Sequence, residues 1–276
     1  AGVSPGLQRK KTELVFAPFL NRLRESLPMK VVATYNIKGG VGKTAAAVNL
    51  AWLAGRSGLR TLVWDLDPQG AATFYFRVQP KVRGGGRKLM KGSSQIRDFI
   101  KGTDYENLDL MPADFSYRNL DIHLDQKKNP TKRLKKLLAP LKADYDLIVL
   151  DCPPSISLVS ESVFFAADAL VVPVIPTTLS QRTLEQLYGF RSERKLEGLK
   201  LLIFFSLVDR RKKLHHELMD EIAGHYREVM KTYIPNASQV ERMGVFKKPI
   251  GDFAGACNAA QAYEELWAEV KTALWR

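Results

Sequence analysis

The stretch that decides the fold reads Lys38, Gly39, Gly40, Val41, Gly42, Lys43, Thr44, and it lies between an apolar run at 31–35 and apolar residues at helical spacing over 44–53. Glycines allow the amides of a loop to converge on one point, because they lack a side chain and adopt positive φ without strain. A lysine followed by a hydroxyl residue suits nucleotide phosphates and their Mg²⁺. We therefore predict a nucleotide-binding P-loop from Lys38 to Ala45.

This loop departs from the ordinary P-loop at its first residues. The usual signature has a glycine five residues before Gly42, whereas this chain has Ile37 there and Lys38 next. The alternative interpretation is a glycine-rich turn that binds nothing. The strand before the loop and the helix after it argue against that alternative, because they are the context in which the motif binds phosphate.

Two further apolar runs end in carboxylates. Residues 61–70 read TLVWDLDPQG and contain Asp65 and Asp67, while residues 145–154 read YDLIVLDCPP and contain Asp151. Ligands of open α/β sheets bind outside the carboxyl ends of the strands. For Asp65 and Asp67 a plain turn at a strand end is the alternative, but a lone buried carboxylate such as Asp151 is costly without a cationic partner.

In this order, KGGVGKT, DLDPQG and DCPPS make the chain similar to the ParA/MinD family of deviant Walker A ATPases. The similarity runs from about residue 30 to the C-terminus and is closest to ParA-like partition and positioning ATPases that lack an N-terminal helix-turn-helix domain. It implies that Lys38 reaches the nucleotide of a partner subunit, so that a homodimer encloses ATP. It also implies that Asp67 orients the attacking water, that Thr44 binds Mg²⁺ directly, and that Asp65 and Asp151 lie near Mg²⁺ and contact it through water.

The chemistry implied by the resemblance is ATP hydrolysis. Phosphoryl transfer needs positioning and charge neutralisation more than covalent chemistry. The reaction can therefore be supported by two lysines, Mg²⁺ and one carboxylate that orients water. In this set Lys38 and Asp67 have the catalytic roles. We expect slow conversion of ATP to ADP and phosphate, stimulated by a ParB-like or other cargo adaptor. An ATP-binding regulatory or scaffold protein with negligible turnover is an alternative.

The chain has 276 residues, of which 45% are hydrophobic. The motifs follow one another without a break, which predicts one domain over residues 30–276 after an N-terminal extension of residues 1–29. Apolar residues at 14–27 could form one face of a helix in this extension. No run of 18 apolar residues and no signal-peptide pattern occurs, so we expect a cytoplasmic protein. The two cysteines, Cys152 and Cys257, give neither a disulfide framework nor a metal-site spacing.

Strands and helices are predicted to alternate along the chain. This order indicates an α/β fold with a doubly wound, mostly parallel sheet and helices on both faces, as in P-loop NTPases. The expected strands are at 30–36, 60–66, 107–112, 145–151, 169–175 and 200–206. The expected helices are near 43–57, 94–101, 131–142, 157–167, 180–196, 212–230 and 259–274.

The formal net charge of +13 suggests an anionic partner. By resemblance to ParA-like ATPases, we predict nonspecific binding of double-stranded DNA and association with the nucleoid, since phosphate contacts alone provide such binding. Solvated faces are the alternative for the two basic clusters concerned. These clusters are Arg210, Arg211, Lys212, Lys213 and Lys247, Lys248. The basic stretch at 77–101 could instead face a partner protein. No aromatic residues interleave with these charges in the sequence, so stacking on single strands is not predicted.

A MinD-like membrane-surface positioning ATPase is the alternative function. The segment 259–274 places apolar residues on one helical face, but its other face carries Glu264, Glu265 and Glu269, which an anionic membrane repels. We therefore predict that this helix packs against the sheet and that no stable membrane association occurs. The apolar face consists of Tyr263, Leu266, Trp267, Val270 and Leu274.

Overall fold

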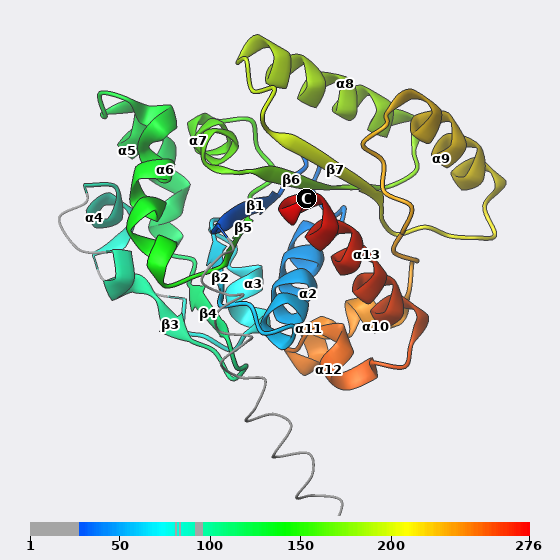
Figure 1. Cartoon of the computed structure of the whole chain (residues 1–276), viewed down its shortest axis with the longest axis horizontal. Coiled ribbons are helices and arrows are strands. Elements are labelled where there is room, and N and C mark those ends of the chain that lie inside the picture. Colours follow the sequence, from blue (N-terminus) through cyan, green and yellow to red (C-terminus); the bar gives the residue numbers. More distant parts are fainter. Residues whose placement is uncertain (1–27, 81, 83, 92–95) are drawn as a thin grey trace, which may run out of the picture.

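The structure is a computed structural model that describes residues 28–80, 82, 84–91 and 96–276. Most of the predicted N-terminal extension, including its helical face at 14–27, lies outside the described residues. So do six positions of the basic stretch at 77–101, namely residues 81, 83 and 92–95. Figure 1 shows a central sheet between two layers of helices.

The sheet has seven strands in the order β3-β4-β2-β5-β1-β6-β7. All neighbouring strands are parallel except β3, which runs antiparallel to β4 at one edge. The central strands are apolar on both faces, as expected of parallel strands covered by helices on each side. Their bounds are β1 (Lys30–Thr34), β2 (Thr61–Asp65), β3 (Lys101–Gly102), β4 (Leu108–Met111), β5 (Leu147–Asp151), β6 (Ala169–Val174) and β7 (Lys200–Phe205).

Helices cover both faces of the sheet, which confirms the predicted doubly wound fold. On β1, Val32 faces one hydrophobic core, while Val31 and Ala33 face the other. The helices are α2 (Lys43–Arg56), α3 (Ala71–Tyr75), α4 (Gly85–Lys91), α5 (Leu120–Asp125), α6 (Arg133–Leu138), α7 (Leu158–Ala166), α8 (Thr178–Glu193), α9 (Lys213–His225), α10 (Ser238–Glu241), α11 (Met243–Phe246), α12 (Ile250–Ala254) and α13 (Asn258–Trp275). The 3-10 helices are η1 (Ile96–Phe99), η2 (Phe115–Asn119), η3 (Pro130–Lys132) and η4 (Ala139–Ala143).

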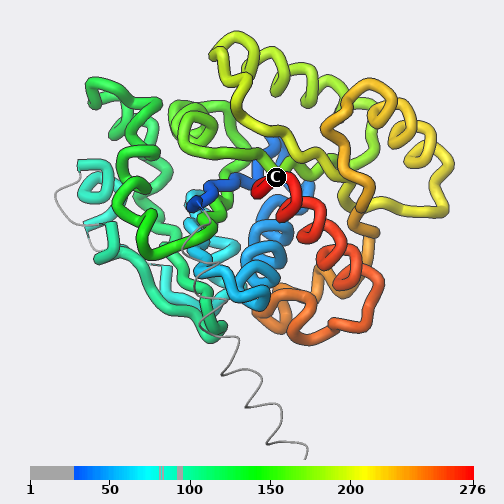
Figure 2. Tube along the Cα trace, viewed as in Figure 1, coloured from blue at the N-terminus to red at the C-terminus, as the bar shows by residue number. Residues whose placement is uncertain are grey.

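Helix α13 packs beside α2, as the ribbon in Figure 1 and the tube in Figure 2 show, and all five residues of its predicted apolar face are buried. Glu264 and Glu265 are exposed, and Glu269 accepts the backbone N–H groups of Lys231 and Thr232. The apolar face is therefore used inside the protein. Within the described ranges, no helix is both long enough and apolar enough to cross a bilayer.

Several predicted helix bounds were wrong. The helix expected at 94–101 is instead the 3-10 helix η1 followed by β3. The helix expected at 212–230 ends at His225, because the residues after it pair with the outer edge of β7. The N–H of Ile203 donates to Glu228 O (3.1 Å), and the carbonyl of Ile203 accepts from Met230 N–H (2.7 Å). Pairing with a strand that is distant in the sequence overrides local helix propensity here.

Other differences concern short elements. The helix expected at 131–142 is divided into η3, α6 and η4, and Pro140 lies in the first turn of η4. The glycine run at 84–86 does not prevent a helix, since α4 begins at Gly85. The helices α3, α5, α10, α11 and α12 were not predicted, because four to six residues carry too little periodicity to be recognised.

Candidate nucleotide-binding site

Three of the predicted site segments meet at the carboxyl edge of the sheet. Thr34 of β1 and Asp65 of β2 lie in register with Asp151 of β5, on either side of it. The Thr34 hydroxyl donates to Asp151 Oδ1 at 3.2 Å. Two carboxylates are thus brought together next to the loop that follows β1, at the edge where ligands of such sheets bind.

The loop between β1 and α2 has the backbone that its glycines predicted. Gly40 and Gly42 have φ of 72° and 93°, in the region that favours glycine. A Cβ at Gly42 would lie 2.9 Å from Ser206 Oγ, so the loop packs tightly against the end of β7. Helix α2 begins at Lys43 with no acidic residue in its first turn, which leaves its N-terminus open to an anion.

The two lysines of the loop differ in their surroundings. Lys43 is buried, and its ammonium donates to the carbonyl of Lys38 at 2.9 Å. Burial lowers the pKa of Lys43, while Asp151, then Cys152 and Asp67, act to raise it. The buried ammonium therefore faces the carboxylates at the sheet edge, where a phosphate chain would also benefit from its charge.

Lys38 has a fixed backbone and a free side chain. Its N–H donates to Asn36 Oδ1 (2.9 Å), and Asn36 Nδ2 in turn donates to Pro173 O (2.8 Å). Together with the bond from Lys43, both backbone groups of Lys38 are held. The side chain is half-buried and makes no hydrogen bond or ion pair with any described residue.

Asp151 is fully buried and has an unsatisfied oxygen. Its Oδ2 has no hydrogen-bond partner among the residues that the structure describes. Burial raises the pKa of Asp151 and the nearby charge of Asp65 adds to this, while hydroxyls of Thr44 and Thr34 oppose it. A buried carboxylate with an orphaned oxygen suits a hydrated cation, so Thr44 and Asp151 fit a Mg²⁺ that arrives with nucleotide phosphates.

No group of three or more Asp, Glu, His or Cys side chains able to hold a metal ion occurs in the described part of the chain. A Mg²⁺ that arrives with a nucleotide does not need such a group, because it keeps several waters and uses substrate phosphates with one or two protein groups. Cys152, next to Asp151, is buried, and burial raises the pKa of its thiol.

The carboxylate of Asp65 fixes the residues that follow β2 through hydrogen bonds. Its Oδ2 accepts from the N–H (2.8 Å) and the hydroxyl (2.7 Å) of Thr73, and its Oδ1 accepts from Asp67 N–H (3.2 Å). Burial raises the pKa of Asp65, and the bonds from Thr73 oppose this. The Thr73 hydroxyl also accepts from Ala113 N–H at 2.9 Å. Asp65 and Thr73 thereby join β2, α3 and the segment after β4.

Asp67 lies in the turn that Asp65 supports. Its Oδ1 accepts from Gln69 N–H (2.9 Å), and its carbonyl accepts from Gly70 N–H (2.9 Å). Its Oδ2 makes no hydrogen bond with described residues, and the side chain is half-buried. The turn thus presents one carboxylate oxygen beside the P-loop. Thr73 and Ser206 were missed by the sequence analysis, since no motif contains them.

The two predicted DNA-binding clusters lie on separate elements. Residues 210–212 lie in the exposed loop between β7 and α9, and Lys213 is the first residue of α9. Arg211 makes a bidentate pair with Asp209 (3.0 Å to each oxygen), and Lys213 pairs with Glu217 (3.2 Å). The side chains of Arg210 and Lys212 form no ion pair with described residues.

The second cluster lies between α11 and α12, near α3. Lys248 pairs with Asp252 at 3.0 Å, and the ammonium of Lys247 lies 4.7 Å from the ring centroid of Phe74. Arg77 similarly lies 5.9 Å from the ring of Tyr105. Aromatic rings therefore do accompany some of these cations in space, which the linear sequence did not reveal.

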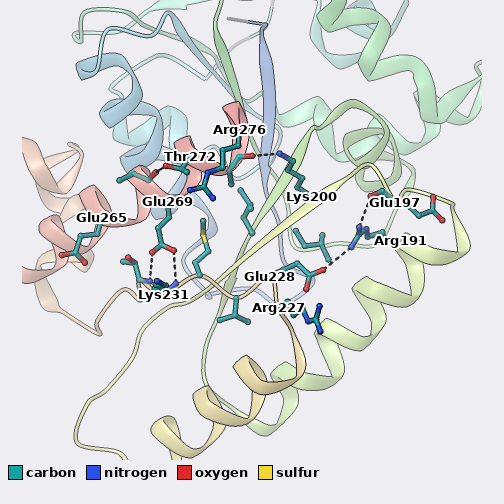
Figure 3. A pocket seen from close by; sticks show the side chains of 17 residues that line it. Arg191, Glu197, Lys200, Arg227, Glu228, Lys231, Glu265, Glu269, Thr272 and Arg276 are labelled. Atoms are coloured by element: carbon teal, nitrogen blue, oxygen red, sulfur yellow. Dashed lines mark hydrogen bonds and ion pairs between the residues drawn. The ribbon is translucent and has the colours of Figure 1, made fainter.

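A cavity of about 1000 Å³ lies at the opposite, amino end of β7, between α8 and α13. Figure 3 shows part of its lining: Glu269 accepts the backbone N–H groups of Lys231 and Thr232, and Arg191 lies 3.7 Å from Glu228. The volume of this cavity does not make it the functional site, because the predicted P-loop and the carboxylate oxygens of Asp67 and Asp151 that lack partners lie at the other end of the sheet.

Comparison with known proteins agrees with this geometry. A family model described as an AAA domain matches residues 29–197. The chain is 32% identical over 251 residues to the sporulation initiation inhibitor protein Soj of Bacillus subtilis, covering 87% of this chain and 98% of that protein. It is 30% identical over 251 residues to the chromosome partitioning protein ParA of Myxococcus xanthus, covering 87% of each chain.

A solved structure of another protein has the same fold and contains a nucleotide analog. Cobyrinic acid a,c-diamide synthase from Mycobacterium smegmatis, with a bound ATP analog and magnesium, superimposes with a TM-score of 0.75 at 27% identity, covering 88% of this chain and 94% of that one.

Proposed function

The chain belongs to the ParA-like partition ATPases within the AAA domain family, and from this membership we propose that it is an ATP-driven positioning switch. ATP hydrolysis in general follows from the family. The finer proposal is a homodimer that forms over ATP, holds DNA without sequence preference, and separates after hydrolysis stimulated by an adaptor protein. Through this cycle it positions or segregates a cargo, which is a plasmid, a chromosome or a protein assembly.

The observation that carries the proposal is the contrast between Lys38 and Lys43. The Lys43 side chain is buried, and its ammonium donates to the Lys38 carbonyl in the same loop. In Lys38 the backbone N–H and carbonyl are both hydrogen-bonded, but the ammonium has no partner among the described residues. A second cation on a rigid loop at the nucleotide edge supports a role in reaching the phosphates of a partner's ATP. Assembly would then depend on the nucleotide.

Within one protomer, the loop from Lys38 to Ala45 would cradle the phosphates through its amides and Lys43. Mg²⁺, when bound with ATP, would neutralise charge on the phosphates. Thr44 would be its direct ligand, and Asp151 would hold it through water. Asp67, with its free Oδ2, would orient the attacking water. Asp65 would act near the metal chiefly by fixing the Asp67 turn, since both of its oxygens accept hydrogen bonds.

For DNA binding, the cluster at 210–213 is better supported than the pair at 247–248. Arg210 and Lys212 are exposed and form no ion pair with described residues, so they can contact phosphates without breaking a bond. Such contacts would place the protein on the nucleoid in the cytoplasm. The MinD-like membrane alternative receives less support, because the apolar face of α13 is already buried.

Co-sedimentation separates these functions. The protein is mixed with long duplex DNA or with anionic liposomes, each with ATP or ADP. We expect pelleting with DNA in ATP only. The double variant Arg210→Ala/Lys212→Ala should weaken binding and lower the slope of log K against log salt concentration by about two, roughly one for each phosphate contact. Lys142→Ala, an exposed lysine of η4 at the opposite sheet edge, is the control. ATP-dependent binding to liposomes without binding to DNA would overturn the proposal.

A further inference from the structure

Asn36 lies where the chain leaves β1 and turns into the P-loop, and its side chain is buried. Its Nδ2 donates to the carbonyl of Pro173 in β6 at 2.8 Å, and its Oδ1 accepts from Lys38 N–H at 2.9 Å. These two partners fix the orientation of the amide, because a carbonyl requires a donor and an N–H requires an acceptor. Asn36 thus joins Lys38 to a strand residue that lies 137 positions from Asn36 along the chain.

The bond from Asn36 to Pro173 adds a side-chain rung to the ladder between β1 and β6. Tyr35 N–H donates to Val171 O at 3.1 Å, and the next carbonyl of β6 that faces β1 is that of Pro173, two residues later. If β1 continued, the N–H of residue 37 would donate to it. The Asn36 amide supplies this donor instead, which satisfies a buried carbonyl and allows the backbone to turn away from the sheet.

The P-loop is held by β6 and β7 as well as by β1. Strand β6 lies between β1 and β7 in the sheet (Figure 1). Asn36 joins the first residue of the loop to β6, while Gly42, near its end, packs closely against Ser206. Ser206 N–H in turn donates to Val174 O of β6 at 2.8 Å. Both ends of the loop are therefore positioned by the same strand.

Lys38 depends on Asn36 for its position. The Lys38 side chain has no bond with a described residue, so its backbone determines where the ammonium can reach. The Lys38 carbonyl accepts from the Lys43 ammonium, a group for which the phosphates of a bound nucleotide compete. The bond from Lys38 N–H to Asn36 uses no group that the phosphates need. Nucleotide binding therefore leaves this bond in place.

We propose that Asn36 is a positioning residue for Lys38: by joining Lys38 to β6, it holds the lysine where its ammonium reaches the nucleotide of a partner protomer. This inference rests on the proposed function. Both polar atoms of the Asn36 amide are engaged within the protomer, so the residue acts through Lys38 and does not itself contact the phosphates. A fixed backbone lowers the entropy cost of ordering the long lysine side chain at the interface.

Two substitutions separate the two bonds of Asn36. Asn36→Ala removes both. Asn36→Ser keeps a hydroxyl that can accept from Lys38 N–H, as serine does in such turns, but serine is too short to reach the Pro173 carbonyl. If Asn36→Ala does not fold, Asn36→Ser still tests the connection to β6.

Thr103→Ala is the matched control. The Thr103 hydroxyl accepts the N–H of the residue two positions ahead, Tyr105, at 3.1 Å, and it donates to the carbonyl of Leu108 at 2.6 Å. This is the bonding pattern of Asn36, but Thr103 follows β3 at the sheet edge opposite β7. Its loss should affect stability without affecting Lys38.

The experiment measures nucleotide binding and assembly separately, at a temperature well below the Tm of every variant. Calorimetric titration gives the affinity for ATP, and sedimentation velocity over a range of protein concentrations with a non-hydrolysable ATP analogue gives the dimer dissociation constant. We expect ATP affinity to stay within about threefold of wild type in all variants. The dimer dissociation constant should rise by about tenfold or more in both Asn36 variants, close to 1.4 kcal/mol, and stay unchanged in Thr103→Ala.

Four results would overturn the inference. They are unchanged assembly of Asn36→Ala, full assembly of Asn36→Ser, an equal loss of assembly in Thr103→Ala, and a loss of ATP affinity as large as the loss of assembly. The wild-type protein distinguishes this inference from the proposed function. If the wild-type protein binds the analogue and stays monomeric, the proposed function fails and the inference fails with it. If the wild-type protein and Asn36→Ala both dimerise, only the inference fails.

Discussion

Replacing Thr73 with valine tests the hydrogen-bond network under the Asp67 turn. Thr73 is fully buried, and its hydroxyl donates to Asp65 Oδ2 at 2.7 Å and accepts from Ala113 N–H at 2.9 Å. Valine has nearly the same shape but no hydroxyl. The substitution therefore removes two hydrogen bonds and leaves a buried N–H group without its partner.

The expected loss can be estimated from these two bonds. A hydrogen bond to a charged group contributes about 1.5–3 kcal/mol, and an unsatisfied buried polar group costs about 1–3 kcal/mol. We expect Thr73→Val to lower the free energy of unfolding by roughly 3–5 kcal/mol. For a domain of this size, each kcal/mol lowers Tm by about 2–4 °C, so Tm should fall by roughly 10 °C.

Urea unfolding of Thr73→Val and Thr73→Ser provides the comparison. Serine keeps the hydroxyl and loses one methyl group, for which about 1 kcal/mol is expected. ATP turnover should fall more than ATP affinity in Thr73→Val, because Thr73 supports the Asp67 turn and does not belong to the P-loop. If Thr73→Val is as stable as Thr73→Ser, the network does not stabilise this edge as we infer.

Two further predictions concern the loop and the buried carboxylates. Gly42→Ala should destabilise the protein by about 1–2 kcal/mol and weaken ATP binding, because alanine would be strained at a left-handed φ and its Cβ would clash with Ser206 Oγ. Adding Ser206→Ala should restore part of the stability, measured by urea unfolding, and part of the ATP affinity, measured by calorimetric titration. A Gly42→Ala variant with unchanged stability and affinity would contradict this packing. Burial raises the pKa of Asp151 to about 8, so without nucleotide the folded state keeps a proton that the unfolded state loses above about pH 4. The free energy of unfolding should therefore fall between about pH 4 and about pH 8. Asp151→Asn should flatten this dependence in urea unfolding, and an unchanged slope would show that Asp151 is not its source.

Local patterns in the sequence were sufficient to predict the main strands and the P-loop. Residues 31–33 and 147–150 are continuous apolar runs, and Gly42 carries the positive φ that its motif requires. The meeting of Asp65 and Asp151 was also predictable in outline, because parallel strands end at the same edge of a sheet. The strands and the P-loop depend on neighbours within a few residues, whereas the meeting of the two carboxylates follows from the general topology of parallel sheets.

The remaining features depend on contacts between distant segments. Thr73 has no motif of its own, and its role appears only when Asp65 and Ala113 are placed beside it. The same is true of Lys247 over Phe74, where the left-handed lysine gives no signal that a glycine would give. Helix α9 was predicted too long for the same reason, since the end of the expected helix pairs instead with β7.

We propose that Lys38 makes assembly depend on ATP, and this can be tested by measuring the mass of Lys38→Ala in solution. Light scattering is performed on the wild-type protein, Lys38→Ala and the control Lys142→Ala with saturating ADP, ATP or a non-hydrolysable ATP analogue, and nucleotide binding is measured in parallel. We expect the wild-type protein and the control to be dimers with ATP or the analogue and monomers with ADP, while Lys38→Ala binds ATP and stays monomeric. A Lys38→Ala dimer, or a wild-type monomer with ATP bound, would contradict the account.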